Sequence, residues 1–132
     1  MSDEAAKGVF MGLACGDALG RPVEFESTDE IESEYGRLSE MEGFGRWGKS
    51  PGTLTDDTDQ ALCIAWSLVE CGTFDPEDIA NRFVEWYETG PFDVGILTQR
   101  AIKAIARGRP WDVSGQAIWE NQKKGAMQET GV

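Results

Sequence analysis

Apolar stretches with helical spacing alternate along the chain with short polar segments rich in Gly, Pro and Asp. The strongest apolar stretch covers residues 56–70. One face of it follows the i, i+3, i+4, i+7 spacing of a helix, with Leu62, Ala65, Trp66 and Val69. Three more apolar residues widen that face almost to the full circumference, namely Ala61, Ile64 and Leu68. The pattern therefore predicts a central, buried helix.

The same periodicity predicts four further helices. Asp75-Pro76-Glu77-Asp78 combines an N-cap residue, a Pro at the first helical position and acids in the first turn, which indicates a helix from Pro76 to about Glu88. Apolar residues at helical spacing predict the others at about 4–19, 94–107 and 113–123. A shorter helix is expected within 28–38. Aromatic residues at helical positions, Trp66, Phe83 and Trp86, are interpreted as core residues.

Four glycines recur at four-residue intervals in the first predicted helix: Gly8, Gly12, Gly16 and Gly20. Each costs roughly 1 kcal/mol relative to Ala inside a helix, so a stripe of four needs a reason. Close packing of another backbone and approach of a ligand are the two interpretations. Pro22 is expected to end this helix and to leave Val23-Glu24-Phe25 extended.

These elements predict an all-α fold, a helical bundle, in which residues 1–132 form one domain or part of one. The segment 42–52 is a glycine-rich loop, but it contains neither the G-x-G-x-x-G spacing nor a phosphate-binding P-loop.

The formal net charge of −12 argues against nucleic acid and anionic membrane surfaces as general partners. The sequence contains no His, which excludes Ser-His-Asp triads, Cys-His pairs and His-bearing zinc sites within this chain. Any hydrolytic chemistry must then use carboxylates, hydroxyls, amines or metals bound by oxygen.

Three cysteines, Cys15, Cys63 and Cys71, lie in apolar helical patterns without Cys-x-x-Cys spacing, so buried, reduced thiols are expected. The N-terminus is acidic and no apolar segment approaches the length of a membrane span. A cytoplasmic location is the favoured interpretation, and the oligomeric state is left open.

The segment GTLTDDTDQA, residues 52–61, concentrates oxygen ligands at the start of the most apolar helix. Helix capping explains part of it, because Thr53 or Thr55 can accept from unpaired backbone N–H groups and acids are favoured in a first turn. Capping explains adjacent acids less well, since Asp56 and Asp57 repel each other at the start of a helix expected to be buried. Metal binding is the competing interpretation.

Carboxylate and hydroxyl oxygens suit hard cations such as Mg²⁺, Mn²⁺ or Ca²⁺ and do not suit zinc or copper. Further ligands could come from two acids that stand alone among apolar residues and glycines, Asp17 and Glu24.

Three motifs carry a resemblance to a known family. They are Gly12-Leu13-Ala14-Cys15-Gly16-Asp17-Ala18-Leu19-Gly20-Arg21-Pro22-Val23-Glu24-Phe25, Gly52-Thr53-Leu54-Thr55-Asp56-Asp57-Thr58, and Gly90-Pro91-Phe92-Asp93-Val94-Gly95. In order and spacing they resemble the N-terminal motifs of the ADP-ribosylglycohydrolases, which include the dinitrogenase reductase-activating glycohydrolases and the J1 crystallins. The resemblance covers essentially the whole chain.

The resemblance implies an all-α fold with a binuclear Mg²⁺ or Mn²⁺ site and hydrolysis of the bond that joins ADP-ribose to a protein side chain or small acceptor. Thr55, Asp56 and Asp57 match residues at the metals. Glu24 or Asp56 would position or deprotonate the attacking water. The segment Gly95-Ile96-Leu97-Thr98 matches a helix start that approaches the ADP-ribose diphosphate.

Members of that family are roughly twice as long, so the chain corresponds to an N-terminal half that lacks the second set of metal ligands. Two alternatives remain beside the enzyme. One is a non-catalytic module of the same fold that binds ADP-ribose or metal, and the other is an acidic helical domain whose clusters are only caps.

Overall fold

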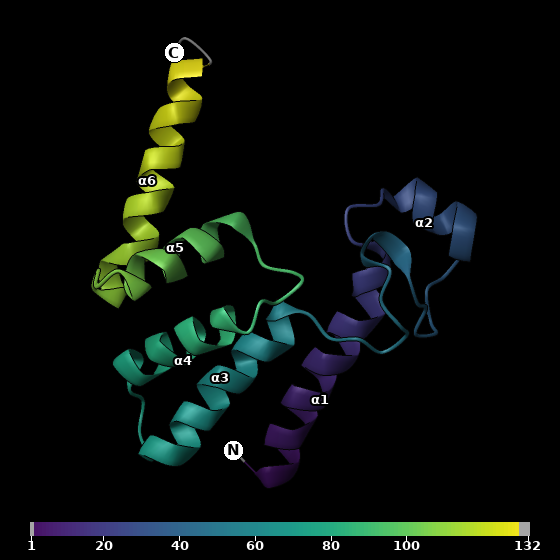
Figure 1. Ribbon diagram of the computed structural model, residues 1–132. Helices are drawn as coiled ribbons and strands as arrows, with labels where there is room; N and C mark the ends of the chain where they lie inside the picture. Colours follow the sequence, from purple (N-terminus) through teal and green to yellow (C-terminus); the bar gives the residue numbers. More distant parts are fainter. Residues whose placement is uncertain (1, 130–132) are drawn as a thin grey trace. The chain divides into compact units, whose positions relative to one another are not determined.

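The computed structural model describes the backbone of residues 2–129 and the side chains of residues 2–121. Within residues 2–129, six α-helices and two short 3-10 helices follow one another (Figure 1). Within the described residues the β contacts amount to one isolated bridge, between Phe44 and Lys49. The all-α prediction is confirmed. No helix in the described residues combines the length and the apolar character needed to cross a membrane.

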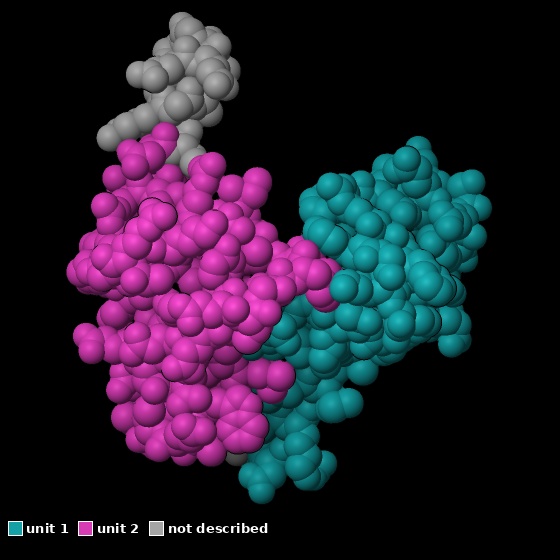
Figure 2. Space-filling view, in the orientation of Figure 1, with its two compact units in different colours: residues 1–59 teal, residues 60–132 magenta. Residues whose placement is uncertain are grey.

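The chain divides into two compact units, residues 1–59 and 60–132, which Figure 2 colours separately. Unit 1 contains α1 (Asp3–Gly20), η1 (Arg21–Val23), α2 (Thr28–Tyr35), η2 (Gly45–Trp47) and the start of α3 (Asp56–Cys71). Unit 2 contains the rest of α3 together with α4 (Pro76–Glu88), α5 (Ile96–Ala106) and α6 (Trp111–Glu129). The helix bounds lie within a few residues of those predicted, except at the far end of α6.

The segment after α1 differs from the expectation that Val23-Glu24-Phe25 would be extended. Residues 21–23 form the 3-10 helix η1, and the backbone N–H of Glu24 donates to the carbonyl of Arg21. Pro22 fits because its fixed φ and missing N–H are tolerated in the first turn of a helix. Phe25 then turns the chain with a φ of 70°.

The glycine-rich loop contains one position, Gly45, where a glycine is required because η1 and η2 approach each other closely. Gly45 has a φ of 51°, and a Cβ placed on it would lie 2.2 Å from the carbonyl oxygen of Pro22. Any side chain would therefore collide with the backbone of η1.

The glycine stripe of α1 behaves differently. A Cβ built on Gly8, Gly12, Gly16 or Gly20 would meet no atom within 4 Å. Within unit 1, therefore, no described atom packs closely along this stripe.

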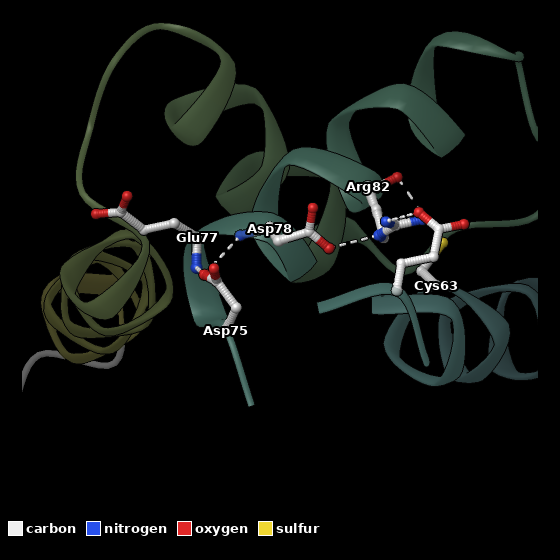
Figure 3. Close-up of polar contacts among 6 residues, drawn as sticks. Cys63, Asp75, Glu77, Asp78 and Arg82 are labelled. Atoms are coloured by element: carbon white, nitrogen blue, oxygen red, sulfur yellow. Dashed lines mark hydrogen bonds and ion pairs between the residues drawn. The ribbon is translucent and has the colours of Figure 1, made fainter. Parts of the chain in front are cut away.

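The core of unit 2 is formed by α4 and α5, and α6 packs on α5. Its buried apolar side chains are Ile79, Ala80, Trp86 and Ile102. The predicted N-cap of α4 is confirmed, because the carboxylate of Asp75 accepts from the backbone N–H groups of Glu77 and Asp78. This cap appears on the left of Figure 3.

The prediction that α3 is buried on most sides was wrong for the described structure. Trp66 keeps 55% of its surface exposed and Val69 keeps 72%, and Leu62, Ile64 and Leu68 are exposed as well. Periodicity identifies which residues share a face, but it does not determine whether the chain contains elements that cover that face. Of the three aromatic residues interpreted as core, Trp86 is buried and Phe83 half-buried.

Cys15, Cys63 and Cys71 do not form disulfides, as expected from their spacing. Their burial was predicted less well, because Cys15 and Cys71 are exposed and Cys63 is half-buried. The two exposed thiols belong to the apolar helical patterns in which burial was expected.

Arg82 connects α3 to α4 within unit 2. Its Nε donates to Asp78 (2.6 Å), one of its terminal nitrogens donates to Glu70 (2.7 Å), and its carbonyl oxygen lies 3.8 Å from Sγ of Cys63. In Figure 3 the carboxylate of Asp78 points toward the Arg82 guanidinium. This guanidinium lowers the pKa of Asp78 below its ordinary value.

The lowered pKa of Asp78 predicts a pH dependence. Asp78 binds a proton more weakly in the folded chain than in the unfolded one, so its stabilising contribution is complete above about pH 4 and is lost as the pH falls through the folded value. We expect Asp78→Asn to destabilise the chain at pH 7 and to have a smaller effect at pH 3, as measured by urea unfolding. Equal effects at both pH values would contradict this, and Glu77→Gln is the matched control on the same turn.

Candidate metal and substrate site

The carboxylate of Asp17, in the last turns of α1, accepts three hydrogen bonds from the start of α3. The backbone N–H of Thr55 donates to it at 2.9 Å, the hydroxyl of Thr55 at 2.8 Å, and the hydroxyl of Thr58 completes the set. Thr55 is 7% and Thr58 4% exposed. One buried arrangement, which we call the Asp17 clamp (Asp17, Thr55 and Thr58), therefore fixes the residues that begin α3.

Thr55 also acts as the cap of α3. Its hydroxyl accepts from the backbone N–H of Asp57 at 3.4 Å while it donates to Asp17. A hydroxyl offers one donor and two acceptor lone pairs, so one lone pair of Thr55 remains for a further partner. The capping interpretation is confirmed for Thr55. Capping still leaves one lone pair on this oxygen with which it could bind a cation.

Asp56 and Asp57 follow directly, in the first turn of α3. Asp57 is exposed and Asp56 half-buried. The positive end of the helix dipole favours both carboxylates, yet they repel each other. A neutral hydroxyl and two carboxylates in consecutive residues form an all-oxygen donor set, which fits a hard divalent cation.

This donor set is incomplete by itself. Across the described residues, no group of three or more His, Cys, Asp or Glu side chains is arranged to hold a metal ion. Divalent cations bound by oxygen take about six ligands or more, so Thr55, Asp56 and Asp57 could occupy only one side of a coordination shell.

Glu24 lies in the same unit, at the end of η1. The indole Nε1 of Trp47, in η2, donates to one oxygen of its carboxylate at 2.9 Å. This bond holds the half-buried Glu24 side chain in one orientation. Sequence reasoning identified Glu24 but had no means of finding Trp47, because the two residues are joined only by the fold of the loop.

Arg21 is the residue that sequence reasoning missed. It is 3% exposed and donates to backbone carbonyls in the loop that precedes α3. No side-chain pattern could have identified it, since every residue offers a main-chain acceptor. The only signal was an arginine placed between Gly20 and Pro22 in an otherwise apolar motif.

The segment Gly95–Thr98 belongs to unit 2 and begins α5. Gly95 is the N-cap residue and supplies no side-chain cap, and Ile96 and Leu97 are exposed. The first N–H groups of a helix lack partners within it, so this end can accept an anionic group.

Comparison with known proteins places these motifs in one family. The model of the ADP-ribosylglycohydrolase family matches residues 2–130. The ADP-ribosyl-[dinitrogen reductase] glycohydrolase of Rhodospirillum rubrum is 43% identical over 100 residues, which are 76% of this chain and 34% of that protein. The ADP-ribosylarginine hydrolase Tri1 of Serratia proteamaculans is 34% identical over 116 residues, 82% of this chain and 30% of that protein.

A vertebrate relative matches over more of the chain. The ADP-ribosylhydrolase ARH3 of Gallus gallus is 32% identical over 134 aligned positions, 96% of this chain and 36% of that protein. The matched part of the chain spans about a third of the length of each of these relatives. Because the family model covers nearly all of it, the chain belongs to the ADP-ribosylglycohydrolase family.

Proposed function

We propose that this chain carries the first part of the active site of a divalent-metal-dependent hydrolase that cleaves the bond between ADP-ribose and a protein side chain or small acceptor. The observation that carries the proposal is the Asp17 clamp, which holds Thr55 rigidly and places two adjacent carboxylates at the same helix start. The names of the relatives from R. rubrum and S. proteamaculans, which specify ADP-ribosylated dinitrogen reductase and arginine, support this class of substrate.

Thr55, Asp56 and Asp57 would hold Mg²⁺ or Mn²⁺. When bound, such an ion supplies Lewis-acid stabilisation of developing negative charge. The family resemblance implies a pair of ions, and the remaining ligands would lie in the part of the relatives that this chain does not match. The clamp contributes by fixing Thr55 before any ion arrives, so little ordering of that residue is required on binding.

A carboxylate is needed to take a proton from water. In the proposed reaction the carboxylate takes one proton from water, the water oxygen attacks the anomeric carbon, and the bond from that carbon to the acceptor atom breaks. The carboxylate then gives this proton to the leaving acceptor atom. Glu24, oriented by Trp47, and Asp56 are the two candidates for this carboxylate. Gly95–Thr98 would bind the diphosphate through the N–H groups in the first turn of α5.

The proposal predicts hydrolysis that depends on metal. We expect the chain to release ADP-ribose from an ADP-ribosylated arginine peptide with Mg²⁺ or Mn²⁺ and not with EDTA, as measured by chromatography. Glu24→Gln should reduce release by about 100-fold or more without weakening metal binding if Glu24 is the base. Glu40→Gln, an exposed acid in the same unit, is the matched control. Release that continues in EDTA would contradict the proposal.

A non-catalytic module that binds ADP-ribose or metal is the second candidate. It is favoured by the short span of the chain, about a third of its relatives, and by the incomplete set of acids. Calorimetric titration with ADP-ribose in the presence of Mn²⁺ distinguishes the two. Binding accompanied by hydrolysis of the peptide supports the enzyme, and binding without hydrolysis supports the module.

A further inference from the structure

Arg21 donates four hydrogen bonds, all to main-chain carbonyl oxygens of one segment. Its Nε donates to Thr53 at 3.1 Å, one terminal nitrogen donates to Phe44 at 3.4 Å, and the other donates to Lys49 at 3.4 Å and Ser50 at 3.1 Å. The segment that it binds, residues 44–53, runs directly into the residues of the Asp17 clamp. We call it the Arg21 loop.

A guanidinium suits this arrangement for a geometric reason. Its five N–H groups lie in one rigid plane, so the positions of the carbonyls that bind it are fixed relative to one another. Burying the charge is costly unless hydrogen bonds compensate, and the bonds to four carbonyls provide that compensation. The buried charge is therefore used to determine the path of a loop that has little regular secondary structure of its own.

Arg21 and Asp17 act on the same stretch of chain from one end of α1. They are four residues apart in sequence, on the last turn of α1 and the first residue of η1. Arg21 binds the carbonyl of Thr53, and Asp17 binds the N–H and the hydroxyl of Thr55 two residues later. Two oppositely charged side chains thus hold consecutive parts of the backbone immediately before Asp56 and Asp57.

We propose that Arg21 is a positioning residue for the metal-binding group Thr55, Asp56 and Asp57, acting through the Arg21 loop and without contact to metal or substrate. This inference rests on the proposed function, because it gives Arg21 a role at the same site. In the chain without metal, the guanidinium of Arg21 already sets the path of residues 53–57.

The test uses the complete chain labelled with ¹⁵N and two variants, Arg21→Met, which keeps much of the side-chain length, and Arg21→Lys, which keeps the charge but not the fork. Two quantities are measured in each: the amide signals of residues 53–57 without metal, and the affinity for Mn²⁺ by calorimetry. We expect the amide signals to shift in both variants. Mn²⁺ affinity should fall by about tenfold or more in Arg21→Met and by less in Arg21→Lys.

Two controls separate positioning from general destabilisation. Arg107→Met removes an exposed arginine at the end of α5 and should change neither quantity. Ile102→Ala opens the core of unit 2, so it lowers stability without touching the Arg21 loop. It should leave Mn²⁺ affinity unchanged at a temperature where the variant is folded. Equal losses of affinity in Ile102→Ala and Arg21→Met would overturn the proposal.

Failure of the proposed metal site and failure of the proposed role of Arg21 give different results. If the wild-type chain binds no Mn²⁺ at residues 55–57, the proposal of a metal site is wrong, and the amide signals alone then decide the role of Arg21. Shifts of the amide signals of residues 53–57 support positioning of the segment, whereas the signals next to position 21 shift with any substitution there and are not counted. Unchanged signals of residues 53–57 in both Arg21 variants overturn it, whatever the metal does. If Arg21→Met does not fold, Arg21→Lys is judged by the same two quantities.

Discussion

Replacing Asp56 and Asp57 together with Asn is expected to weaken Mn²⁺ binding by about 100-fold or more, because the affinity of an oxygen site depends strongly on how many charged ligands it has. The fold should survive this change. Each acid in a first helical turn contributes only about 0.3 to 1 kcal/mol through the helix dipole, and removing two adjacent like charges offsets part of that loss. Calorimetric titration with Mn²⁺, together with urea unfolding of the same variant, measures both effects.

Asp59→Asn is the matched control for this prediction, since Asp59 lies in the same first turn of α3. It removes the same kind of charge from the same helix dipole but is not assigned to the metal. We expect it to keep Mn²⁺ affinity within about twofold of wild type, because Asp59 is not among the proposed ligands. Loss of affinity in Asp59→Asn equal to that in the double variant would indicate only a general attraction of cations to acidic surface.

Asp17→Ala is expected to lower the free energy of unfolding of unit 1 by about 3 kcal/mol, because it leaves two buried hydroxyls and one backbone N–H without their charged acceptor. Asp17→Asn should cost less, since its amide keeps one acceptor oxygen and its NH₂ group can donate to a rotated hydroxyl. Urea titration followed through the amide signals of residues 15–23 and 53–59 reports on this unit.

Glu40→Ala is the control for the Asp17 variants. Glu40 is an exposed acid of unit 1, so its replacement should change the free energy of unfolding by no more than about 0.5 kcal/mol. If Asp17→Ala were as stable as Glu40→Ala, the three hydrogen bonds to Asp17 could not be what holds the start of α3.

The helices could be predicted from the sequence because local signals determine them. Asp75 and Pro76 mark the start of α4 by chemistry that acts within one turn, and the observed helix has the predicted bounds. The exposure of Trp66 and Val69 could not be predicted in this way. Burial depends on whether another element covers a face, and periodicity contains no information about that element.

In the candidate site, too, some residues could be predicted from the sequence and others could not. Thr55, Asp56, Asp57 and Glu24 could be identified as candidates because oxygen-bearing side chains stand out among apolar residues and glycines. The residues that hold these candidates in place could not be identified from the sequence. Trp47 and the four carbonyls around Arg21 are brought to η1 by the path of an irregular loop, and that path depends on long-range packing such as the approach of Gly45 to Pro22.

The most direct test of the central claim, that Thr55, Asp56 and Asp57 form one side of a divalent metal site, is a map of Mn²⁺-induced line broadening over the amide signals of the wild-type chain. The chain carries a net charge of −12, so diffuse binding of cations to its surface is the competing outcome. We predict that at low Mn²⁺ concentration the broadening is strongest at residues 55–58. Equal broadening at other acidic surfaces, such as Glu32 and Glu34 of α2 or Glu77 of α4, would contradict the claim.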